Sequence, residues 1–78
     1  MDNYTEAVLA QLRAEMAVRK MTAKDLAPRV GVHYATLLRY LSGERNLPVV
    51  VLGNILNTLG VGPGDFFERA GKLEGGTK

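Results

Sequence analysis

The chain contains no cysteine, no tryptophan and only one histidine among its 78 residues. Without cysteine it can form neither a disulfide nor a thiolate metal site, and the lone His33 has no second ligand type at a suitable spacing. A glycine-rich phosphate loop after a strand is also missing, as is any comparable catalytic motif. We therefore expect no bound metal, no cofactor and no enzymatic activity.

Long apolar runs are missing too, since none is longer than Val49–Leu52. That run is far too short to cross a bilayer, and the first residues, MDNYTEA, lack the basic and apolar regions of a signal peptide. Hydrophobic residues make up 46% of the chain and charged residues 23%, as in ordinary soluble proteins. These features predict a cytoplasmic protein with one small domain and no membrane contact.

Positive charge is concentrated in the middle of the chain. The formal net charge is only +2, but residues 19–45 hold six basic and two acidic side chains, a local charge of +4 that leaves −2 for the remainder. A basic surface within an acidic frame suits contact with phosphates. A run of solvated charges would give the same composition, so charge alone does not decide between the two.

Glycine and proline divide the chain into five helical segments, and no segment alternates like a strand. The first helix should follow Asn3, whose side chain can form a capping box with Glu6. Its apolar positions recur at helical spacing: Val8, Leu9, Leu12 and Met16. The second helix should run from a Thr22 cap through Val30 and end at Gly31.

The three remaining helices are predicted in the same way. A third should span Tyr34–Ser42 with Gly43 as its left-handed terminator, and a fourth should begin near Pro48 and stop at Gly60. The inward positions of the fourth are Leu52, Ile55, Leu56 and Leu59. A fifth should start at Pro63 and stop at Gly71. Its buried face should be Phe66, Phe67 and Ala70. This is an all-α fold, with a domain over residues 1–70 and a flexible tail over 71–78.

The second and third helices are joined by Gly31-Val32-His33, which is typical of two helices that cross steeply at a glycine turn. The run T-A-K-D-L-A-x-x-x-G-V-x-x-x-T-L-x-x-Y-x-x-G, followed by L-x-x-I-L-x-x-L-G-V, resembles the Cro/CI-type (XRE-family) helix-turn-helix domain of phage and bacterial repressors. The resemblance covers roughly residues 8–70. It implies a compact five-helix, lambda-repressor-like fold that binds double-stranded DNA sequence-specifically, with the helix Tyr34–Ser42 in the major groove.

Helical geometry gives the third helix two distinct faces. At about 100° per residue, one apolar sector contains Leu37, Leu41, Tyr34 and Tyr40, and we assign Leu37 and Tyr40 to the core. The opposite side carries small and polar residues: Ala35, Arg39 and Ser42. Such a side is open enough to enter a major groove.

The resemblance places base contacts at the start of this helix and one turn further along: His33, Tyr34, Ala35, Thr36 and Arg39. Arg39 is the candidate for a bidentate contact to guanine, and the alternative is a surface pair with a carboxylate. Tyr34 either meets a thymine methyl or a phosphate, or completes the rim of the core. Ala35 and Thr36 either contact thymine or phosphate or are purely structural. His33 stands where the family usually has a capping serine or threonine.

Phosphate contacts are expected from the flanks of the same helix: Lys24, Arg29, Ser42, Arg45 and Asn46. A solvated loop is the alternative for any one of them. Two departures from the family pattern concern docking. Ala23 replaces a common phosphate-binding glutamine, and Met16 with Leu41 replaces a buried arginine–glutamate pair, a change that is often neutral or stabilising.

Two copies would be needed to occupy two half-sites. Unassigned apolar residues suggest a homodimer contact, through Val49, Val50 or the C-terminal helix, although they equally suit core and scattered surface positions: Leu38, Val49, Val50, Val51 and Phe67. The alternative function is an antitoxin or another protein-binding module with the same fold, which would need an exposed apolar surface and would tolerate loss of Arg39.

Overall fold

A computed structural model describes the backbone of residues 3–75 and the side chains of residues 4–73. Within that range the chain forms five helices and no strand, as the sequence predicted. They are α1 (Asn3–Val18), α2 (Ala23–Val30), α3 (Tyr34–Ser42), α4 (Val49–Leu59) and α5 (Pro63–Gly75). In this part of the chain no helix is long and apolar enough to span a membrane.

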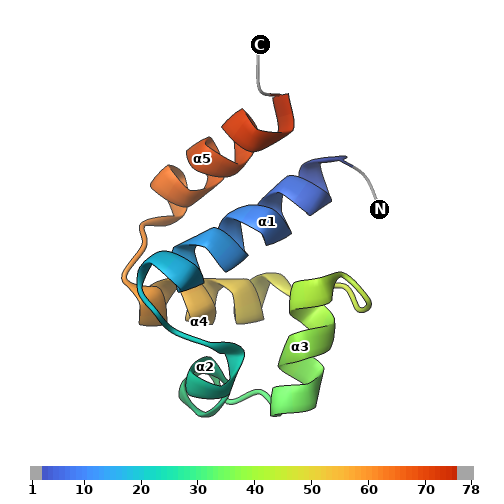
Figure 1. Cartoon of the computed structure of the whole chain (residues 1–78), viewed down its shortest axis with the longest axis vertical. Coiled ribbons are helices and arrows are strands. Elements are labelled where there is room, and N and C mark those ends of the chain that lie inside the picture. Colours follow the sequence, from blue (N-terminus) through green and yellow to red (C-terminus); the bar gives the residue numbers. More distant parts are fainter. Residues whose placement is uncertain (1–2, 76–78) are drawn as a thin grey trace.

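Helix α1 occupies the centre of the arrangement, between α5 and α4 (Figure 1). Its contact with α5 is the most extensive between any two elements. Figure 1 views α2 nearly along its axis and α3 from the side, so these two helices cross steeply. Helix α3 lies at the end of the molecule away from α5 (Figure 1), and its buried residues are Leu37 and Leu41.

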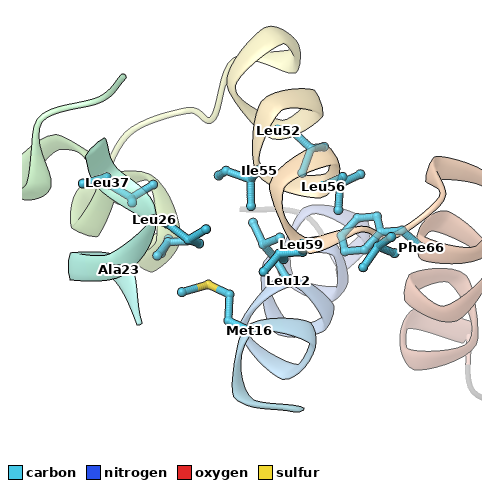
Figure 2. Close-up of a cluster of buried hydrophobic side chains, with 13 residues drawn as sticks. Leu12, Met16, Ala23, Leu26, Leu37, Leu52, Ile55, Leu56, Leu59 and Phe66 are labelled. Carbon is cyan, nitrogen blue, oxygen red and sulfur yellow. The ribbon is translucent and has the colours of Figure 1, made fainter. Parts of the chain in front are cut away.

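The core receives at least one side chain from each helix (Figure 2). The largest fully buried side chains are Leu12, Leu26, Leu37, Ile55 and Phe66. They belong to α1, α2, α3, α4 and α5 in that order, so every helix is anchored to the same cluster. Truncation of any of the four aliphatic ones to alanine should cost about 2–5 kcal/mol of stability.

Helix ends agree with the predicted capping chemistry. The Thr22 hydroxyl accepts the Asp25 backbone N–H at 3.2 Å, while the Asp25 carboxylate accepts the Thr22 backbone N–H at 2.9 Å. Three glycines end α2, α3 and α4 in the left-handed conformation, with φ of 72° at Gly31, 86° at Gly43 and 76° at Gly60. These angles strain any residue with a Cβ, so the terminators are specific to glycine.

Two predictions for the last helix are wrong. Helix α5 does not stop at Gly71 but continues to Gly75, because Gly71 keeps a negative φ and α5 packs along α1. Phe67 is not buried with Phe66 and Ala70 but is 38% exposed, since it lies about 100° around the helix from Phe66. Its ring meets that of Phe66 edge-on, with centroids 5.2 Å apart.

Other expectations stand in part or lie outside the described residues. Tyr40, assigned to the core, is only partly buried. The side chain of Asn3 is outside the described range, so its cap stays a prediction. The same holds for flexibility of the tail, whose residues 76–78 are not described.

Candidate nucleic-acid interface

The turn between α2 and α3 follows directly from its three residues. Gly31 reverses the chain with φ of 72°, and the Val32 N–H then donates to the Ala27 carbonyl at 3.1 Å. The Val32 side chain packs against the core and fixes the corner. His33 stands at the N-cap of α3 without a side-chain capping bond, as expected of imidazole at this position.

Helix α3 has a buried and an open face, as its periodicity predicted. Leu37 is fully buried and Leu41 nearly so, whereas Ala35 and Arg39 are exposed. The open face is therefore not covered by other described parts of the chain. Tyr34 is 44% exposed, so much of its side-chain surface is free.

The Arg39 guanidinium makes no hydrogen bond or ion pair with any described residue. The alternative of a surface pair with a carboxylate is thus not present in this structure. Because a guanidinium on an exposed helix face keeps all five donors available, Arg39 has the geometry for bidentate recognition.

The predicted base-contact residues come from one short segment and, Thr36 excepted, are exposed. Thr36 is partly buried. The predicted phosphate-contact residues are all exposed and come from α2 and from the end of α3 with its following loop. Arg29 lies near enough to the Asp25 carboxylate to be attracted by it. The candidate phosphate-contact residues therefore lie before α3 and at or after its end in the sequence.

Ser42 is less free than the sequence suggested. Its hydroxyl donates to the Arg39 carbonyl at 3.1 Å and accepts the Glu44 backbone N–H at 3.3 Å. The single hydroxyl proton is therefore engaged in closing the turn after α3. A phosphate contact by Ser42 would require this bond to be exchanged.

Both departures from the family pattern are apolar and packed. Ala23 is buried at the start of α2, and the Met16 and Leu41 side chains both lie in the core cluster. No charge is therefore buried where the family usually places an ion pair, and that stretch of core is held by apolar contact alone.

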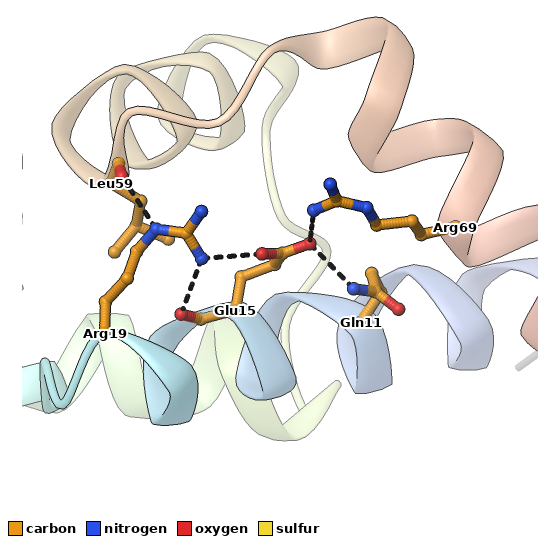
Figure 3. Close-up of polar contacts among 5 residues, drawn as sticks. All are labelled: Gln11, Glu15, Arg19, Leu59 and Arg69. Atoms are coloured by element: carbon orange, nitrogen blue, oxygen red, sulfur yellow. Dashed lines mark hydrogen bonds and ion pairs between the residues drawn. The ribbon is translucent and has the colours of Figure 1, made fainter.

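Sequence reasoning missed a polar network on α1 (Figure 3). The Glu15 side chain is only 4% exposed, and its carboxylate lies 2.7 Å from Nη1 of Arg19, 2.7 Å from Nη1 of Arg69 and 2.7 Å from Nε2 of Gln11. Arg19 also donates through Nε to the Leu59 carbonyl at 2.9 Å. Gln11 and Arg19 lie four residues before and four residues after Glu15, and this i,i+4 spacing could have identified the part of the network within α1.

The network changes the acidity of Glu15. Burial opposes ionisation and raises the pKa, but hydrogen bonds from Arg69, Gln11 and Arg19, with the charge of Arg69, outweigh it and leave the pKa of Glu15 below its ordinary value. The carboxylate is thus held ionised between α1 and α5.

Sequence reasoning also missed Arg13. Its Nη1 donates to the Leu41 carbonyl at 2.8 Å, joining α1 to the last turn of α3 across 28 positions of sequence. Nothing in local spacing indicates this bond, because it depends on where α3 lies relative to α1.

Comparison with known proteins agrees with the geometry. The profile of a family described as the Cro/C1-type HTH DNA-binding domain matches residues 11–71. The matched range begins within α1 and ends within α5, so it includes α2, α3 and all of the candidate contact residues. No match was found among curated proteins or among solved structures.

Proposed function

Because the chain belongs to the family of Cro/C1-type helix-turn-helix DNA-binding domains, we propose that it is a repressor of phage or bacterial origin. In this proposal it recognises a specific operator in double-stranded DNA with α3 in the major groove. Its place of action is the cytoplasm, where such DNA lies. The observation that carries the proposal is the exposed face of α3, on which the Arg39 guanidinium has no partner among the described residues.

Roles follow from position on α3. Arg39 donates two N–H groups to a guanine edge, while His33, Tyr34, Ala35 and Thr36 contact bases at the start of the helix. The flanking side chains then bind phosphates and fix the register of the protein on the duplex: Lys24, Arg29, Ser42, Arg45 and Asn46.

The test begins with selection of bound sequences from random duplex DNA, repeated over a range of salt concentrations. An enriched motif that persists at higher salt supports the proposal, whereas binding of all duplexes alike, lost with salt, contradicts it.

Three variants assign the contacts once an operator is known. Arg39→Ala should lower operator affinity roughly 5- to 150-fold without a change in melting temperature. Arg45→Ala should weaken operator and unrelated DNA equally and lower the salt dependence by about one counterion. Lys72→Ala is the matched control, because it removes one charge from an exposed position on α5. It should change neither operator affinity nor the salt dependence. Unchanged operator binding by Arg39→Ala would contradict the proposal that α3 lies in the major groove.

We also propose that two copies bind together on two half-sites. Val49 is 83% exposed and Val50 is 73% exposed at the start of α4. Val49, but not Val50, lines a groove of about 580 Å³ whose other apolar lining residues include Tyr4, Val8, Leu47, Leu52 and Phe67. Exposed valines next to such a groove favour association. Val50→Lys should then lower operator affinity and the sedimentation coefficient, while Val18→Lys, at an equally exposed valine on α1, should do neither.

The same groove favours the second candidate function, an antitoxin-like module that holds another protein. The two functions differ in which residues they need. A protein-binding module would keep its activity in Arg39→Ala and lose it in Val49→Lys, whereas a repressor loses operator discrimination with Arg39.

A further inference from the structure

The carbonyl groups at the end of α3 are satisfied in two different ways. A helix leaves its last carbonyls without partners inside the helix. Here the Arg39 carbonyl accepts the Arg45 N–H at 3.2 Å, and the Tyr40 carbonyl accepts the Gly43 N–H at 3.2 Å, both from the turn that follows. The Leu41 carbonyl instead accepts Nη1 of Arg13, which belongs to α1. Among the described residues, this is the only hydrogen bond that connects the last turn of α3 to another helix.

The Arg13 bond acts where α3 has little other support. Helices α1 and α3 contact each other far less than α1 and α5 do, and between them lies a surface hollow lined by Arg13, Met16, Met21, Leu38, Leu41 and Ser42. Apart from the Arg13 bond, that end of α3 rests on α1 through apolar side chains. Because apolar contact is not directional and the α1–α3 contact is small, it holds the angle of this end of α3 only loosely. A charged hydrogen bond at 2.8 Å is directional and also favours the negative end of the helix dipole.

The turn fixed by Arg13 is the one that carries Arg39. A bidentate contact to a base edge requires the guanidinium to arrive in plane and in register. A tilt of α3 about its buried Leu37 would move the Arg39 guanidinium, because that group lies at the end of a long side chain on the exposed side of the helix. The angle of α3 relative to α1 therefore determines whether Arg39 reaches its base.

We propose that Arg13 is a positioning residue for DNA recognition. It holds the last turn of α3 at the angle that operator discrimination needs, through the Leu41 carbonyl and without touching DNA. The inference rests on the proposed function and adds to it a specificity-determining residue outside the helix-turn-helix unit.

The test compares Arg13→Met, which keeps the aliphatic stem but removes the guanidinium, with Arg13→Lys, which keeps the charge and a donor. Arg69→Met is the matched control, because it removes an arginine that bonds α1 to α5 and leaves α3 untouched. For each variant, affinity is measured for the selected operator and for a scrambled duplex of equal length, across a range of salt concentrations and well below the melting temperature.

Arg13→Met should lower operator affinity about tenfold and leave scrambled-duplex affinity and the salt slope unchanged, so that the discrimination ratio falls. Arg13→Lys should recover part of that ratio. Arg69→Met should lower the melting temperature but not the ratio. A lost phosphate contact would instead weaken both duplexes equally and reduce the salt slope, and that outcome would overturn the inference, as would an unchanged ratio in Arg13→Met.

Hydrogen exchange of the free protein tests the structural step without DNA. The amides of Gly43 and Arg45, bonded to the last turn of α3, should exchange about tenfold faster in Arg13→Met and at the wild-type rate in Arg69→Met. Unchanged exchange in Arg13→Met overturns the positioning role. If the wild-type chain shows no preference for any duplex, the proposed function fails and the inference fails with it, whereas a preference that Arg13→Met retains overturns the inference alone.

Discussion

The Glu15 carboxylate and the Arg69 guanidinium lie 2.7 Å apart, although they are 54 positions apart in the chain. This pair joins α1 to α5, the two helices with the most extensive contact, at a point where one partner is buried and the other is half exposed. Because Arg19 meets the same carboxylate and also the end of α4 through the Leu59 carbonyl, one charge on α1 organises three helices.

Stability should fall in acid because of Glu15. Its pKa in the folded state lies below the ordinary value of 4.5, so the unfolded chain binds the proton more tightly. The contribution of Glu15 is therefore complete above pH 4.5 and is lost as the pH falls through the lower, folded-state pKa. Thermal melts at a series of pH values should show a shallower acid slope for Glu15→Gln than for the wild type.

Asp25 provides the control for that experiment. Its pKa is also lowered, first by the Thr22 backbone N–H and then by the Thr22 hydroxyl, but it is exposed at the start of α2. Asp25→Asn should remove a separate part of the acid slope, and the two losses should add because the sites are independent. Equal acid slopes in the wild type and Glu15→Gln would show that the network is not coupled to folding.

Loss of the Thr22 cap should destabilise the protein. Thr22→Ala removes the acceptor for the Asp25 N–H and should lower the free energy of unfolding by about 1 kcal/mol in denaturant titrations. Thr58 gives a matched control, because its hydroxyl only donates back to the Asn54 carbonyl within α4. Thr58→Ala should change stability by less than about 0.5 kcal/mol, and equal losses in the two variants would contradict the role of the cap.

The end of α1 offers a stabilising substitution. Lys20 has φ of 56°, the one non-glycine residue in the described chain with a positive φ, and it sits where the Met21 N–H returns to the Met16 carbonyl at 2.9 Å. Glycine is the usual residue at this position of the motif. Lys20→Gly should raise the free energy of unfolding by about 0.5–1 kcal/mol. Lys20→Ala removes the same charge but keeps the strain, so calorimetry should find no comparable gain.

The continuation of α5 through Gly71 can be tested with a pair of glycines. A Cβ at Gly71 or at Gly60 would meet no atom within 4 Å, but only Gly60 has a positive φ, 76°. Gly71→Ala should therefore stabilise the protein by about 0.5–1 kcal/mol, and Gly60→Ala should destabilise it by about 1 kcal/mol. If chemical denaturation found both to be destabilising, α5 would end at Gly71 in solution.

The sequence predicted most helix boundaries because their chemistry is local. The Thr22 box and the glycines at 31, 43 and 60 each act within about one turn of backbone, so spacing alone identifies them. The prediction failed at Gly71 because the end of α5 depends on tertiary packing and not on local chemistry. A glycine ends a helix only if the chain turns there, and packing of α5 along α1 keeps this one helical.

For the candidate site, periodicity correctly predicted which side of α3 is buried at Leu37 and which is open at Arg39. Whether Arg39, Tyr34 and their neighbours contact bases stays a prediction. The supports of the site were much less visible. The i,i+4 spacing of Gln11, Glu15 and Arg19 was a usable signal for part of the network, but no signal pointed to Arg69.

The order of residues by itself determined the five helices, most of their ends and most of the side chains that they bury, because these depend on hydrogen bonds and apolar spacing within single turns. Only the tertiary structure decided that Arg13 closes the end of α3 and that Arg69 reaches Glu15. Those bonds join groups 28 and 54 positions apart, and their geometry exists only once the shared core has fixed the angles between helices.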